Sequence, residues 1–107
     1  MKIKAEGDTL QISGMNELGS SNAPWFRDQV RKALGDQERN IEIDFSQVVF
    51  LDSSGLGALI ALHKTALSRN GRLRLLNPAP QARQILELTR MNRVFEIIGN
   101  KADAPTF

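Results

Sequence analysis

Strand-like and helix-like segments alternate along almost the whole of this 107-residue chain. Residues 2–6 and 9–13 alternate apolar and polar side chains around a Gly-Asp pair, which predicts a β-hairpin. The other predicted strands lie at 40–45, 72–76 and 94–98, and apolar spacing predicts helices near 23–34, 56–67 and 81–89. The order β-β-α-β-α-β-α-β predicts one α/β domain with an antiparallel edge on a mixed, mostly parallel sheet. We expect about four to five strands and about three to four helices.

Turn-forming residues predict where these elements end. Asn22 is expected to cap the first helix, and Gly71 to follow the end of the second. Asn77 is expected to cap the third helix, with Pro78 as its first residue. Residues 14–22 are rich in Gly, Asn and Ser, which predicts a loop.

Composition excludes several classes of site. The chain has no Cys, which removes disulfides, Cys-based zinc sites and a cysteine nucleophile. His63 is the single His, so a multi-histidine metal site cannot form; its spacing from Leu56 and Ile60 predicts a core or half-buried position. No apolar run approaches the ~18 residues of a membrane-spanning helix, and the N-terminus lacks the apolar core of a signal peptide. We therefore expect a cytoplasmic protein without membrane insertion.

Charge is uneven along the chain, although the formal net charge is only +2. Residues 63–93 hold seven Lys or Arg and one Glu, whereas residues 1–62 hold six Lys or Arg and nine Asp or Glu. The basic stretch is interpreted as a solvated face, with a surface for an acidic partner as the alternative. The low net charge and the small number of aromatic residues argue against direct binding of nucleic acid.

The segment Asp52-Ser53-Ser54-Gly55-Leu56-Gly57 follows a strand and opens an apolar helix. Its Asp and Ser side chains can cap the helix, and this structural interpretation needs no further function. Gly55 and Gly57 disfavour a helix, by up to about 1 kcal/mol each relative to Ala, and their absent side chains would let another surface approach. We expect Gly55 to be exposed and Gly57 to face the sheet. No Lys ends the segment and Ile60 stands where a third Gly would be, so neither a Walker loop nor a dinucleotide fingerprint is present.

A Ser at a helix N-terminus is also a favourable place for a phosphate. The unpaired N–H groups and the positive end of the helix dipole stabilise a dianion. The same phosphate, lying beside Asp52, would oppose an acidic partner docked there. The segment therefore has the electrostatics of a phosphorylation switch.

Residues 44–60 resemble the signature of the STAS domain family, and the branch they resemble most is that of the bacterial anti-sigma factor antagonists. Similarity continues over residues 14–34, 75–78 and 85–97. The resemblance implies a STAS-like domain over residues 1–99, with a C-terminal tail at 100–107.

That resemblance implies a regulatory binding protein that is not an enzyme and needs no cofactor. Its partner would be an anti-sigma factor or a serine kinase of the histidine-kinase-like ATPase fold. The kinase would phosphorylate Ser53, the Ser directly after the Asp, with Ser54 as second choice, and a PP2C-type phosphatase would restore the protein. The implied partner-binding residues are Glu17, Asp52, Ser53, Ser54, Gly55, Leu56 and Gly57.

Two departures from the family pattern stand out. Glu17 occupies the place where the family often has an Asp, and Arg90-Met91-Asn92 stands where the family often has a Gly. It is therefore left open whether the regulated target is a sigma factor or another protein. Alternatives are a non-switching scaffold or transport-system subunit, a small α/β enzyme or nucleotide binder, and an acidic metal pocket at Glu17, Asp44 and Asp52.

Overall fold

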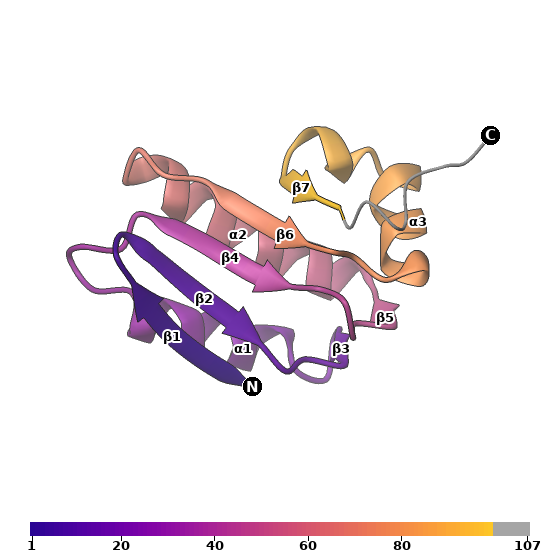
Figure 1. Ribbon diagram of the computed structural model, residues 1–107. Coiled ribbons are helices and arrows are strands. Elements are labelled where there is room, and N and C mark those ends of the chain that lie inside the picture. Colours follow the sequence, from indigo (N-terminus) through magenta and orange to yellow (C-terminus); the bar gives the residue numbers. More distant parts are fainter. Residues whose placement is uncertain (100–107) are drawn as a thin grey trace.

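The computed structural model describes residues 1–99, and a five-stranded mixed sheet forms its centre (Figure 1). The first two strands of the chain pair in antiparallel orientation, and all other neighbours in this sheet are parallel. The sheet order is β1 (Lys2–Glu6), β2 (Thr9–Ser13), β4 (Asn40–Asp44), β6 (Leu73–Leu76) and β7 (Glu96–Ile98). The predicted α/β fold with its antiparallel edge is confirmed. The tail predicted at 100–107 lies outside the described residues.

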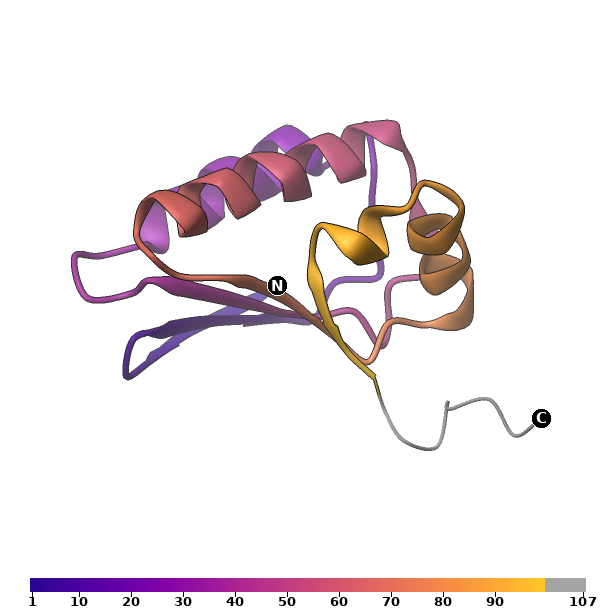
Figure 2. The same ribbon diagram turned by 90° about the horizontal axis from the view of Figure 1, so that it is seen from above.

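The two long helices cover one face of the sheet and leave the other face open (Figure 2). α1 (Ala23–Ala33) and α2 (Ser53–Ser68) lie side by side on the covered face, whereas α3 (Pro80–Leu88) and the 3-10 helix η1 (Met91–Arg93) lie at one end. Within residues 1–99, no helix is both long enough and apolar enough to cross a bilayer.

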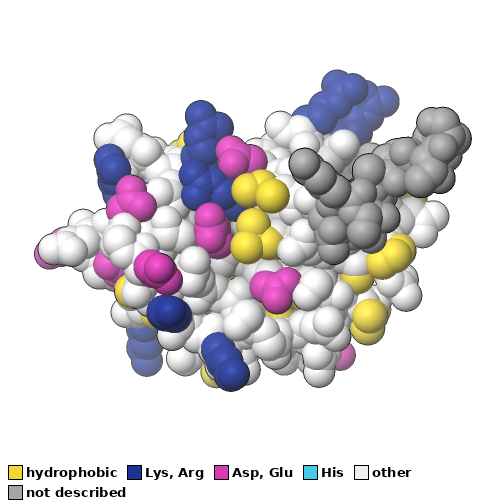
Figure 3. Space-filling model, viewed as in Figure 1, with side chains coloured by type: hydrophobic (Ala, Val, Ile, Leu, Met, Phe, Trp, Pro, Cys, Tyr) yellow, Lys and Arg dark blue, Asp and Glu magenta, His cyan; other side chains and the backbone are white. Residues whose placement is uncertain are grey.

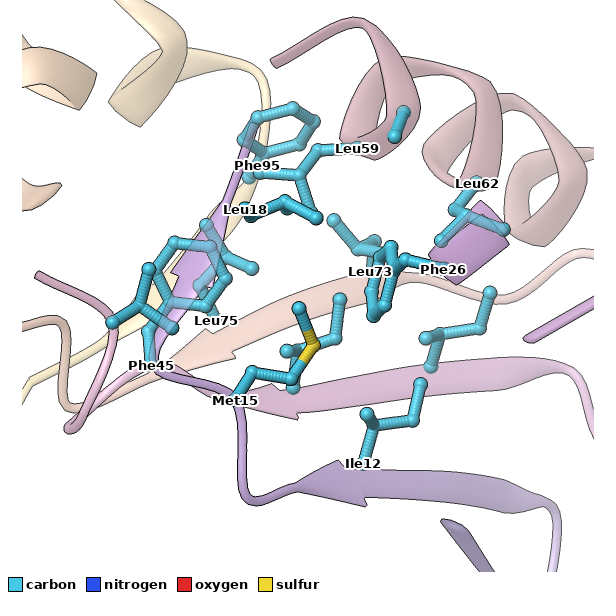
Figure 4. Packing of buried hydrophobic residues seen from close by; sticks show 14 of the residues in the cluster. Ile12, Met15, Leu18, Phe26, Phe45, Leu59, Leu62, Leu73, Leu75 and Phe95 are labelled. Atoms are coloured by element: carbon cyan, nitrogen blue, oxygen red, sulfur yellow. The ribbon is translucent and has the colours of Figure 1, made fainter. Parts of the chain in front are cut away.

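Alternation along the strands builds the core between this sheet and the helices. The inward-facing residues of β2, β4 and β6 are fully buried, as are Phe26 and Val30 of α1 (Figure 4). On α2 the buried residues recur at helical spacing: Gly55, Ala58, Leu59, Leu62 and Ala66. Each fully buried large apolar side chain contributes roughly 1.5–3 kcal/mol to folding. The amphipathic patterns read from the sequence therefore identify the real core faces.

A second, two-stranded sheet lies beside the main one. β3 (Glu17–Leu18) and β5 (Phe50–Leu51) pair in parallel, with Glu17 opposite Phe50. The prediction that residues 14–22 form only a loop was wrong at these two residues. Two residues are too few to show strand periodicity, and Leu18 joins β5 because its side chain is fully buried in the core.

Asn22 stands at the N-cap position of α1, but its side chain does not cap the helix. Its Oδ1 accepts a hydrogen bond from the Gly19 amide at 2.9 Å, and its Nδ2 donates to the Glu17 carbonyl at 2.9 Å. The Asn22 side chain therefore holds the preceding turn instead of capping α1, because both of its polar atoms are bonded to the backbone of that turn.

The third helix begins at Pro80 rather than at Pro78. Asn77 adopts a left-handed backbone conformation, and its amide donates to the Ile98 carbonyl at 2.8 Å. Asn77 therefore extends the contact between β6 and β7 instead of capping α3. Likewise β7 begins at Glu96, because the Val94 and Phe95 amides both bind the Met91 carbonyl.

Three arginines of the basic stretch are paired within the chain. Arg74 donates to Glu42 and Glu96, its neighbours across the open sheet face, at 3.2 and 3.0 Å. Positive and negative side chains accordingly lie side by side on that face (Figure 3). Arg72 lies 3.5 Å from Glu96, and Arg69 donates to the carbonyls of residues 35 and 38. These three arginines of the basic stretch thus make contacts within the folded chain.

Arg90 follows α3 with a φ of +61°, a left-handed conformation that costs residues other than Gly roughly 1–2 kcal/mol. Arg90 begins the segment Arg90-Met91-Asn92, which stands where the STAS-like pattern often has a Gly. Gly would remove the clash but lose more entropy on folding, by about 0.5–1 kcal/mol. We therefore expect Arg90→Gly to raise the free energy of unfolding by about 0.5–1 kcal/mol in urea denaturation. Arg90→Ala, which keeps the Cβ, should show no such gain, and equal gains in both variants would contradict the strain argument.

Candidate functional site

The start of α2 is fixed by Asp52, the N-cap residue between β5 and the helix. Its Oδ1 accepts a hydrogen bond from the Gly55 amide at 3.0 Å. The expectation that Asp52 caps this helix is confirmed. Ser53 and Ser54 do not share that role, because they are the first two residues of the helix itself and both are exposed.

The second carboxylate oxygen of Asp52 reaches a distant part of the chain. Oδ2 accepts a hydrogen bond from the Ser20 amide at 3.0 Å, 32 residues earlier in the sequence. Two hydrogen bonds hold the pKa of Asp52 below its usual range. The one from the Gly55 amide has the larger effect, and the one from the Ser20 amide the next largest. Asp52 is therefore ionised at neutral pH, and it fastens the turn before α1 to the start of α2.

Glu17 comes next to this site through the pairing of β3 with β5. Its side chain is exposed, and Oε1 accepts a hydrogen bond from the Ser21 hydroxyl at 3.1 Å. Glu17 and Asp52 thus bind adjacent serines of one turn. The structure brings together the acidic residues that the sequence had separated by 35 positions.

The two glycines occupy opposite environments, and the expectation for them was wrong. Gly55 is buried, and a Cβ there would lie 2.2 Å from the Leu18 carbonyl oxygen and 2.8 Å from Leu51 Cδ1. Gly57 is exposed, and a Cβ there would meet nothing within 4 Å. Two residues along a helix turn it by about 200°, so burial of the first on β3 turns the second to solvent.

A shallow hollow of about 260 Å³ separates the first turns of α1 and α2. Gly57 and Ser54 contribute its α2 wall, and Ala23, Pro24 and Arg27 its α1 wall. Leu56, by contrast, is only partly exposed and packs against the core. Of the two glycines, Gly57 is therefore the one that leaves room for an approaching surface.

Exposed apolar side chains flank this end of α2. Val49 is 57% exposed, Phe50 52% and Trp25 52%. The sequence pattern did not identify Val49 or Phe50 as exposed. Successive side chains of a strand point to opposite faces, so the buried Leu51 of β5 leaves Phe50 facing outward.

The acidic metal pocket has no support in the structure. Asp44 accepts a hydrogen bond from the Ser46 amide in its own turn, at 2.9 Å. Within the described residues, no group of three or more His, Asp or Glu side chains is placed to hold a metal ion.

Comparisons with known proteins agree with the fold. A protein-family model described as "Mlab, STAS domain" matches residues 1–99. A STAS-domain containing protein of Pseudomonas aeruginosa is 32% identical over 83% of this chain and 85% of its own. The anti-sigma-B factor antagonist of Bacillus subtilis is 23% identical over 89% of this chain and 86% of its own. A crystal structure of a candidate anti-sigma factor antagonist from Thermotoga maritima matches with a TM-score of 0.82 at 25% identity, covering 95% of this chain and 88% of that one.

The opposite environments of the two glycines predict opposite effects of one substitution. Gly55→Ala should lower the free energy of unfolding by about 1–3 kcal/mol, because its Cβ collides with the β3 backbone. Gly57→Ala should raise it by up to about 1 kcal/mol, because Ala is the better helix former and the space is open. Urea denaturation of both variants measures the difference. A Gly55→Ala protein as stable as the parent would refute the close approach of α2 to β3.

Proposed function

The chain belongs to the STAS domain family, and we propose that it is a regulatory binding protein of the anti-sigma factor antagonist type, switched by phosphorylation of Ser53. The observation that carries this proposal is the position of Ser53: exposed, first in α2, and directly after the capping Asp52. We propose that residues 1–99 form the domain that does this. The role is binding and release of a partner in the cytoplasm, not catalysis.

A phosphate on Ser53 suits the local structure of the free protein. It would carry about −1.5 to −2 charges at the N-terminal end of a 16-residue helix, whose unpaired amides and dipole favour an anion. Asp52 already uses both carboxylate oxygens on the Gly55 and Ser20 amides, so its own position stays fixed. Ser54, also exposed, is the second candidate for modification.

The same phosphate would weaken a docked complex. The surface around Ser53 combines the exposed apolar Val49 and Phe50 with the carboxylates of Glu17 and Asp52. Burying such a surface requires the removal of water, and an added dianion raises that cost. It also repels any acidic group that the partner places near the helix start.

The class of partner follows from the family resemblance. An anti-sigma factor, or a serine kinase of the histidine-kinase-like ATPase fold, would bind the unphosphorylated form, and a PP2C-type phosphatase would reverse the modification. The Bacillus subtilis relative is named as an anti-sigma-B factor antagonist, which supports this class of partner.

A non-switching scaffold or transport-system subunit is the second candidate. The observation in its favour is that Asp52 is fully used in holding the fold together, so the Asp-Ser-Ser segment has a structural purpose without phosphorylation. In that case a charge at residue 53 would leave partner binding unchanged.

Charge at residue 53 separates the two functions. With the histidine-kinase-like serine kinase encoded nearest to its gene as partner, Ser53→Asp should weaken binding at least about tenfold, roughly 1.4 kcal/mol. Ser53→Ala should bind like the parent and take up no phosphate from ATP in the presence of that kinase. Calorimetry and phosphopeptide mass spectrometry measure the two effects.

Ser54 supplies the matched control for this experiment. Ser54→Ala should retain phosphorylation, because residue 53 remains. Phosphate uptake that persists in Ser53→Ala and disappears in Ser54→Ala would identify Ser54, and not Ser53, as the modified residue. A Ser53→Asp protein that is folded and binds as tightly as the parent would favour the scaffold.

Gly57 tests whether the partner approaches this end of α2. Gly57→Gln projects a side chain from the hollow between α1 and α2 and meets no atom of its own chain at the Cβ. We expect it to keep the melting temperature within a few degrees, and to lower affinity for the same partner about tenfold or more. Ser68→Gln places the same side chain at the exposed far end of α2 and should bind normally. Equal binding by both variants would place the interface elsewhere.

A further inference from the structure

A larger hollow lies at the other end of α2, away from Ser53. Its volume is about 370 Å³, within the range of small-molecule pockets. His63 and Leu67 of α2, Leu73 at the start of β6, and Val94 and Glu96 near β7 line it. Along the helix axis, Leu67 lies about 21 Å from Ser53, so this hollow is separate from the proposed switch.

The hollow has an apolar wall that the fold leaves uncovered. Leu67 is 54% exposed and Val94 41%, and both line the hollow together with the buried Leu73. An apolar group placed against Leu67 and Val94 would remove both side chains from water, which is favourable.

His63 supplies a hydrogen-bond donor at this wall. The half-buried ring packs edge-on against Phe95, with ring centroids 5.6 Å apart, and burial lowers its pKa, so it is neutral at pH 7. Its Nδ1 is buried and meets no hydrogen-bond partner within the described part of the chain. A proton on the buried Nδ1 would be a donor without an acceptor, so we place the proton on Nε2, which can then donate to a ligand.

Arg72 supplies the positive charge. Glu96 is held at 3.0 Å by Arg74, whereas Arg72 lies 3.5 Å from the other Glu96 oxygen, beyond the roughly 2.7–2.9 Å of a strong charge-assisted hydrogen bond. Most of the Arg72 side chain is exposed at the rim of the hollow. Its planar guanidinium can therefore bind a carboxylate through two parallel hydrogen bonds without releasing Glu96 from Arg74.

We propose that this hollow, between the C-terminal half of α2 and the start of β6 and β7, binds a small carboxylic acid with an apolar body. Arg72 and the His63 Nε2–H bind the carboxylate, and Leu67, Leu73 and Val94 cover the apolar part. A neutral amide of the same shape keeps the apolar contacts and one acceptor oxygen, but it loses the charge attraction and the two-oxygen contact with Arg72. The preference for a carboxylate thus distinguishes this site from a hollow that binds apolar groups without specificity.

The experiment uses a matched pair of probes, 4-methylpentanoate and 4-methylpentanamide, titrated into the full chain by ¹H–¹⁵N NMR. We expect saturable shifts at the amides of Leu67, Leu73 and Val94, with the carboxylate binding about tenfold more tightly than the amide. Arg72→Gln should abolish that preference. Arg83→Gln, which removes an arginine of α3 that does not line the hollow, should retain it.

The proposal is overturned by the absence of saturable shifts at the three amides, by equal affinity for the two probes, or by an Arg72→Gln protein with unchanged preference. The spectrum of each variant shows directly whether it is folded. Because none of these measurements involves phosphorylation, they are independent of the outcome for Ser53.

Discussion

The arrangement at the start of α2 depends on the carboxylate of Asp52. One oxygen caps the helix at Gly55, and the other holds the turn before α1 at Ser20. A single ionised side chain thereby sets the position of α2 relative to α1 and β3. Ser53, the next residue, is presented at the surface because its neighbour is tied down on both sides. The candidate switch is thus the exposed residue next to a structural anchor.

Periodicity in the sequence predicted the main sheet and the three α-helices, because each of these elements buries residues at a regular spacing. It could not predict β3 and β5, which contain two residues each. The same limit applied to the glycines. Which of Gly55 and Gly57 faces the sheet depends on the residue where α2 begins and on the backbone of Leu18, 37 positions before Gly55. Local spacing contains neither fact.

Charge patterning was also ambiguous until the topology was known. Seven basic residues between 63 and 93 suggested a solvated face or a surface for an acidic partner. The sheet register instead places Arg74 between Glu42 and Glu96, and Arg69 is committed to backbone carbonyls. Arg72, which lies between these two arginines in the chain, is held more loosely, at 3.5 Å from Glu96. The strained backbone of Arg90 was equally hidden, since positive φ is assigned to Gly or Asn by default.

The close packing of α2 on β3 also determines which mutations a gene for this protein can tolerate. Every glycine codon begins with two guanines, so each new amino acid that a single base change can introduce carries a Cβ. At codon 55, all of those replacements collide with the Leu18 carbonyl. At codon 57, two codons downstream, the same replacements enter open space. Within one turn of one helix, amino-acid substitution is therefore disfavoured at the first glycine and tolerated at the second.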